Sequence, residues 1–66
     1  AFGSAVRSIR LDKGISQETL ADLAGIDRSY MGGVERGEHN IALINMGRIS
    51  NALEVSVSSV MKKAGL

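Results

Sequence analysis

Apolar residues recur at helical spacing in this chain of 66 residues, and the pattern is clearest between positions 16 and 37. Two short stripes, with spacings of three or four residues, predict one apolar face on each of two consecutive helices. The stripes consist of Leu20, Leu23 and Ala24 in the first helix and of Met31 and Val34 in the second. Gly25 separates them, and glycine readily takes the left-handed conformation that ends a helix.

Polar and small residues at the ends of these two helices fit the same interpretation. Ser16 can accept a hydrogen bond from a free amide at the start of the first helix, and Asp27 can do so for the second. Ala21 lies one turn before the glycine, where two crossing helices need a small side chain. Residues 16–37 are therefore predicted to form a helix-turn-helix unit, a motif whose second helix enters the major groove of DNA.

The rest of the chain predicts three more helices, at about residues 4–13, 42–53 and 56–63, with a loop over 37–41. Their expected core residues are Phe2, Val6, Ile9, Leu43, Met46, Ile49, Ala52, Leu53 and Val60. No proline and no strand pattern interrupts the helices. The predicted fold class is all-α, a compact five-helix domain that includes the whole chain, residues 1–66.

Composition limits the chemistry that is open to the chain. It has no cysteine and a single histidine, His39, so it lacks the residues for a disulfide, a thiolate metal site or a catalytic histidine pair. We therefore expect no catalytic residue, no metal and no cofactor. No apolar run approaches the roughly 20 residues that span a bilayer, which favours a cytoplasmic protein.

Net charge adds little, because a formal charge of +1 at pH 7 is low for a nucleic-acid-binding domain. Five basic residues nevertheless lie in or near the helix-turn-helix unit: Arg7, Arg10, Lys13, Arg28 and Arg36. Five acidic residues lie there as well, so charge by itself does not indicate DNA.

The helix-turn-helix unit resembles that of the Cro and phage-repressor (XRE-like) family of bacterial and phage regulators. The residues that carry the resemblance are Gln17, Leu20, Ala21, Gly25, Ile26, Met31, Val34, Glu35 and Gly37. The run Asp27-Arg28-Ser29-Tyr30 and the ending Glu35-Arg36 are similar to the small controller proteins of restriction–modification systems. Arg10 and residues 49–56 extend the resemblance over the chain. It implies a repressor-like transcriptional regulator that binds double-stranded DNA.

In this family the first residues of the second helix meet base edges, which maps to Asp27, Arg28 and Ser29. Arg28 is the main candidate, because a guanidinium can donate two hydrogen bonds to guanine O6 and N7. Ser29 can donate to a base or a phosphate. Asp27 can accept from cytosine N4, but capping its own helix needs the same oxygens, and capping is the favoured interpretation.

A second group of residues is expected to contact the phosphate backbone: Gln17, Tyr30, Arg10, Arg36, Asn40 and His39. In the family, a glutamine at the position of Gln17 bridges the backbone and the recognition helix, and the loop that contains Asn40 grips the backbone. The alternatives are a solvated glutamine at position 17 and partial packing of Tyr30 with its hydroxyl in water.

The resemblance also implies an ion pair between Arg10 and Glu35 that joins the first helix to the third, with Arg10 also facing a phosphate. Two solvated charges are the alternative. Gly32 and Gly33 depart from the pattern, since Gly33 falls where some relatives carry a base-reading side chain. Either the backbone approaches DNA closely there, or specificity depends more on DNA shape.

A homodimer on a partly palindromic operator is expected, because one short helix with few reading residues supplies little specificity. The apolar residues left over for the dimer interface are Ile44, Val55, Val57 and Met61. Val55 and Val57 have the alternative of closing the monomer core.

Two other interpretations stay open. In the first, the domain is a protein–protein adaptor or the DNA-binding half of a larger regulator such as an antitoxin. A first residue other than methionine suggests that partner domains are missing. In the second, the exposed acids Asp12, Asp22 and Glu38 contact RNA polymerase in an activator. The alternative is that these three acids are solvated charges.

Overall fold

The computed structural model describes residues 2–38 and 41–65, which form five helices and no strand. The helices are α1 (Phe2–Asp12), α2 (Gln17–Ala24), α3 (Arg28–Glu35), α4 (Leu43–Ala52) and α5 (Val57–Lys63). The predicted all-α fold is confirmed. The first helix begins at Phe2, two residues earlier than expected, and Phe2 is buried in the core.

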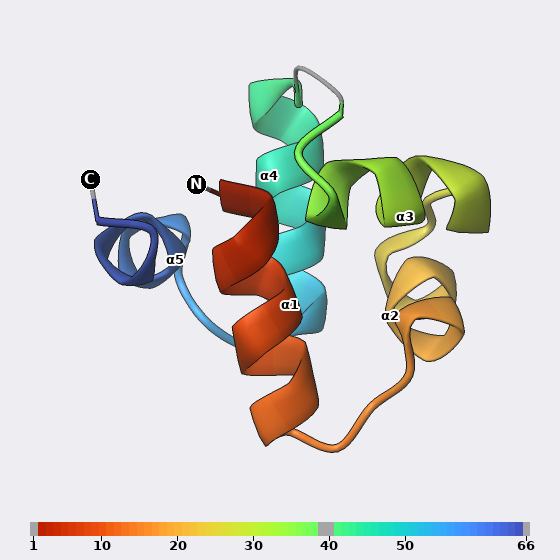
Figure 1. Ribbon diagram of the computed structural model, residues 1–66, viewed down its shortest axis with the longest axis horizontal. Helices are drawn as coiled ribbons and strands as arrows, with labels where there is room; N and C mark the ends of the chain where they lie inside the picture. Colours follow the sequence, from red (N-terminus) through yellow and green to blue (C-terminus); the bar gives the residue numbers. More distant parts are fainter. Residues whose placement is uncertain (1, 39–40, 66) are drawn as a thin grey trace.

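The helices are arranged around a central pair, α1 and α4, which lie one in front of the other in Figure 1. The helix-turn-helix unit, α2 and α3, lies on one side of this pair and α5 on the other (Figure 1). Contacts join α1 to α3 and α5, and α4 to α2 and α5. No helix in the described part of the chain is long and apolar enough to cross a membrane.

The local signals at the helix ends work as the sequence predicts. The Ser16 Oγ atom accepts a hydrogen bond from the Thr19 amide at 3.0 Å and so caps α2. Gly25 has a φ of 68°, in the left-handed region, and the next amide, of Ile26, donates to the Ala21 carbonyl at 2.9 Å. These bonds end α2 sharply and turn the chain into α3.

Most of the expected residues are buried in the core, Ile9, Met46 and Ala52 are partly buried and pack against it, and Leu23 and Leu43 are exposed. The core consists of Phe2, Ala5, Val6, Leu20, Ala21, Ala24, Met31, Val34, Ile49, Leu53 and Val60. Leu23 was expected to be part of it but is 62% exposed, because α2 turns its two alanines inward and Leu23 falls beside that face. Leu43 is 76% exposed, because the first turn of α4 extends past α1 in Figure 1.

One glycine fixes how closely α1 approaches α3. A Cβ added to Gly3 would run into the Val34 carbonyl oxygen and lie 3.1 Å from the Glu35 Cα atom, both backbone atoms that cannot turn aside. Gly47, also within a helix, has nothing within 4 Å of its added Cβ. The two glycines therefore provide a matched comparison.

We expect Gly3→Ala to lower the free energy of unfolding, since α1 must move away from α3. Gly47→Ala should raise it by about 1 kcal/mol, because alanine is the better helix former and meets no atom. Urea unfolding followed by circular dichroism measures both values. An equal gain in both variants would contradict the close approach of α1 and α3.

Candidate nucleic-acid interface

The start of α3 presents polar side chains to solvent. Asp27 caps the helix, with its Oδ2 atom accepting from the amides of Ser29 at 2.9 Å and Tyr30 at 3.2 Å. This confirms the expected capping role. Arg28 and Ser29, the two residues that follow, are exposed. The capping bonds hold the first turn of α3, so they also fix the direction in which Arg28 and Ser29 leave the backbone.

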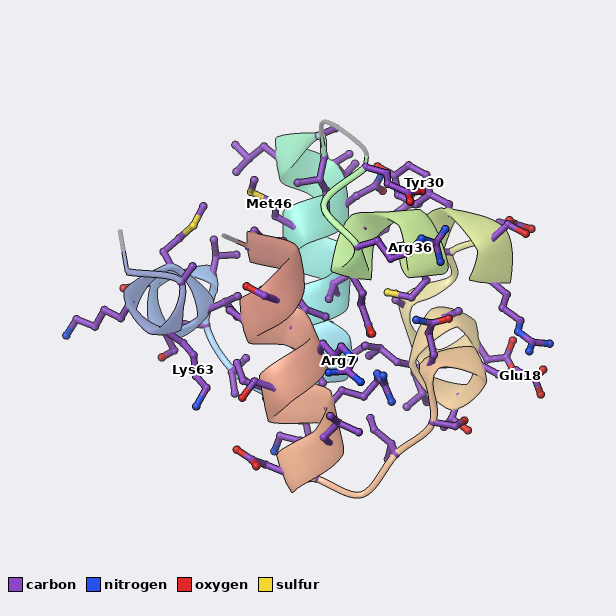
Figure 2. The ribbon with its side chains drawn as sticks, viewed as in Figure 1. Arg7, Glu18, Tyr30, Arg36, Met46 and Lys63 are labelled. Atoms are coloured by element: carbon purple, nitrogen blue, oxygen red, sulfur yellow. The ribbon has the colours of Figure 1, made fainter. Side chains whose placement is uncertain are left out.

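A polar hollow of about 320 Å³ lies between the start of α2 and one face of α3. Its lining contains four residues predicted to contact DNA, together with one glycine, and consists of Gln17, Arg28, Ser29, Gly32 and Arg36. Figure 2 shows Arg36 on the side of α3 that faces the viewer and Glu18 at the outer edge of α2. The fold thus brings together residues from two helices that the sequence could only name separately.

The floor of the hollow is Gly32, and the expectation that Gly33 falls at a base-reading position stays a prediction. An added Cβ on Gly32 would lie 3.0 Å from Arg36 Nη1 and 3.3 Å from Gln17 Oε1, both ends of flexible side chains. Both glycines are buried, but Gly33 is not among the residues that line the hollow, since one residue turns a helix by about 100°. The glycine on the candidate reading face is therefore Gly32.

A buried ion pair lies beneath the hollow. Arg10 Nε and Nη2 donate to the two carboxylate oxygens of Glu35 at 2.8 and 2.9 Å, and Arg10 Nη1 donates to the Ile15 carbonyl at 3.0 Å. Arg10 and Glu35 are each 7% exposed, so the alternative of two solvated charges is wrong. The hydrogen bonds to Glu35 raise the pKa of Arg10, and the guanidinium stays charged.

This position limits what else Arg10 can do. All three of its nitrogens already have acceptors within the protein, and its side chain is 9% exposed. Arg10 lies under the surface rather than on it, so the predicted phosphate contact of this residue gains no support from the structure. Its visible role is to hold Glu35.

Glu35 connects the buried pair to the hollow through Gln17. The Nε2 atom of Gln17 donates to Glu35 Oε1 at 3.1 Å. Gln17 is therefore not a freely solvated side chain, and its amide is fixed at the edge of the hollow. The chain of bonds runs from α1, through the end of α3, to the first residue of α2.

The other predicted site residues lie further out. Tyr30 is half-buried, projects from α3 in Figure 2, and its hydroxyl accepts from Asn45 Nδ2 of α4 at 3.3 Å. His39 and Asn40 fall outside the described residues. The hydrogen bond to Asn45 therefore holds the phenol ring of Tyr30. The phosphate contacts of Tyr30, His39 and Asn40 stay predictions.

The residues predicted for the dimer interface differ in burial. Ile44 is 67% exposed, whereas Val55, Val57 and Met61 are half-buried. Val55 and Met61 pack against the core, which for Val55 agrees with the alternative that it closes the monomer core. The exposed apolar surface of this group is thus concentrated at Ile44, next to the exposed Leu43.

The sequence did not predict that two acids of the interface, Glu18 and Glu38, form ion pairs with arginines. Arg28 Nη1 pairs with Glu18 Oε2 at 2.8 Å, and Arg36 pairs with Glu38 through Nε and Nη2 at 2.9 and 3.1 Å. The bonds to Glu38 raise the pKa of Arg36. Glu18 suits the first turn of a helix, so its sequence position alone gives no signal of a partner on α3. No cluster of three or more potential metal ligands occurs in the segments that the structure describes.

Breaking the buried pair is expected to be costly. Arg10→Met should destabilise the fold by about 3–5 kcal/mol, because Glu35 is left as a buried charge without its main partner. The double variant Arg10→Met/Glu35→Leu should recover most of that loss, and the exposed Glu38→Gln should leave stability almost unchanged. Chemical unfolding of the three variants measures this order, and a double variant no more stable than Arg10→Met would contradict it.

The sequence of the chain matches a known family over most of its length. The family described as helix-turn-helix matches residues 6–60. The control protein C.SmaI of Serratia marcescens is 41% identical over 61 residues, which cover 92% of this chain and 73% of that protein.

Solved structures agree with this match. The restriction-modification controller protein C.AhdI from Aeromonas hydrophila is 49% identical, with a TM-score of 0.87 and 89% of each chain covered. SinR, a master regulator for biofilm formation solved in complex with DNA, is 31% identical, with a TM-score of 0.86, and the match covers 92% of this chain and 98% of that chain. The chain therefore belongs to the helix-turn-helix, XRE-like family of DNA-binding transcriptional regulators.

Proposed function

We propose that this protein is a sequence-specific transcriptional regulator that binds as a homodimer to a partly palindromic operator, with α3 in the major groove. The observation that carries the proposal is the exposed, capped first turn of α3, with Arg28 and Ser29 beside the hollow. A guanidinium at this position can donate two hydrogen bonds to guanine, and a hydroxyl can bond a base or a phosphate. The relatives named as a control protein, C.SmaI, and as a restriction-modification controller protein, C.AhdI, support a controller role.

Backbone contacts are assigned to the residues around this reading edge. Gln17 at the first turn of α2 and Arg36 on α3 flank the hollow, and both can donate to phosphate oxygens. The amides at the start of α2 add donors with a favourable dipole. Tyr30 extends the same edge, and His39 and Asn40 complete the proposed set.

The homodimer is proposed for a geometric reason. A single eight-residue helix reads few bases, and two copies on one face of the duplex read half-sites about 34 Å apart. Ile44, with Val55, Val57 and Met61, supplies the apolar residues proposed for the interface. The proposed site of action is the bacterial cytoplasm, and for an activator the exposed acids Asp12, Asp22 and Glu38 are the proposed contacts with RNA polymerase.

Selection of bound duplexes from a random pool tests the function as a whole. We expect enrichment of two inverted half-sites with fixed spacing, and a steep loss of affinity with added salt, because lysines and arginines displace counterions from phosphates. Enrichment of a single half-site would contradict the dimer. A pool that stays random would favour the adaptor interpretation.

Arg28→Ala is expected to weaken binding to the selected operator by about 1–3 kcal/mol and to relax the preference at one base pair of each half-site. Fluorescence anisotropy with operators substituted at each position measures both effects. Uniform weakening at every position would show that Arg28 contacts only phosphate.

Gly32→Ala separates the two explanations for the glycine in α3. The variant should be more stable by about 0.5–1 kcal/mol, because alanine favours the helix and the neighbouring side-chain ends can shift. If the backbone approaches DNA closely, the same variant binds the operator less tightly, since its methyl group fills the floor of the hollow. Unchanged operator affinity in this more stable variant would instead favour readout through DNA shape.

A further inference from the structure

The two exposed ion pairs of the interface hold their arginines in different ways. Arg36 uses Nε and Nη2 together, so Glu38 occupies one of the two edges of the guanidinium that present two parallel donors. Arg28 uses Nη1 alone, in one bond of 2.8 Å to Glu18 Oε2. Within the described part of the chain, Nε and Nη2 of Arg28 have no acceptor. The Nε–Nη2 edge is therefore available for a further contact in Arg28, whereas Glu38 occupies the same edge of Arg36.

This difference matters for reading a base. Guanine offers two adjacent acceptors, O6 and N7, and a bidentate contact needs two parallel N–H donors on one edge of the guanidinium. The Nε–Nη2 edge of Arg28 meets this need, and the bond to Glu18 does not consume it. An arginine side chain that is already held in place also loses less conformational entropy when it binds.

We propose that Glu18 is a specificity-determining positioning residue, which holds Arg28 through Nη1 so that its Nε–Nη2 edge is presented to guanine. The bond also restrains Arg28 from turning to a phosphate of any sequence. Arg36, with its paired donors on Glu38, contacts the backbone through Nη1 and reads no base. This inference rests on the proposed DNA-binding function and assigns a partner on α2 to the reading residue of α3.

The proposal predicts two effects of opposite sign. Glu18 carries a negative charge near the surface that faces DNA, so as a charge alone it weakens binding to every duplex. As a positioning residue it strengthens binding to the operator. Removing its charge without changing its shape, by Glu18→Gln, should therefore raise affinity for unrelated DNA and lower or leave unchanged the affinity for the operator.

Asp22→Asn is the matched control. Asp22 lies one helical turn further along α2, is exposed, and undergoes the same change of charge, but no ion pair joins it to Arg28 or Arg36. Anisotropy titrations with the selected operator and with a scrambled duplex of equal length give the ratio of the two affinities. We expect this ratio to fall about two- to fivefold in Glu18→Gln, which is the size of effect that an exposed ion pair supports, and to stay unchanged in Asp22→Asn.

A double-mutant cycle then asks whether Glu18 acts through Arg28. In the Arg28→Ala background, Glu18→Gln should leave the affinity ratio unchanged, because there is no guanidinium left to position. Equal changes of the ratio in both backgrounds would overturn the proposal, as would a Glu18→Gln variant that raises both affinities in parallel with Asp22→Asn. If the unmodified protein selects no operator, the proposed function itself fails, which is a distinct result.

Discussion

The buried pair of Arg10 and Glu35 is the interaction on which the rest of the interface depends. It joins residues 25 positions apart and connects α1 to the end of α3, while Arg10 also bonds the turn before α2. Glu35 in turn holds Gln17. One charged contact thus fixes three segments that must keep a common orientation if α2 and α3 are to meet one surface together. Because both charges are desolvated, removing either one leaves the other as an uncompensated charge in a low-dielectric environment.

The recognition helix needs this external support, because its own sequence is poor in helix formers. Gly32 and Gly33 each cost roughly 1 kcal/mol relative to alanine in the middle of a helix. Packing compensates for them: α1 crosses α3 closely at Gly3, and Met31 and Val34 are buried in the core. The gain from Gly32 is a polar hollow in place of a side chain on one face of α3.

Much of the fold could be predicted because its signals are local. Ser16 and Asp27 cap the helices that follow them, and Gly25 takes the left-handed turn, each through bonds within a few residues. Leu23 shows where such reasoning fails. A period of 3.6 residues places it on the same broad stripe as Leu20, but only the neighbouring helices decide which edge of that stripe is covered.

The candidate site shows the same division. The residues at the start of α3 and Gln17 could be named from the sequence pattern and the family resemblance, and the fold brings them to one hollow. The bond of Arg28 to Glu18 could not be predicted from the sequence, because the helix dipole alone accounts for a glutamate in the first turn of a helix.

By itself, the sequence determined the order and approximate extent of the five helices, the turn between α2 and α3, and membership of a helix-turn-helix family. Only the tertiary structure decided which charges are buried, which pair at the surface, and which face of α3 is open. The physical reason is that helix propensity and capping act over a few residues. A contact across 10 or 25 positions depends instead on the angle and distance at which two helices cross.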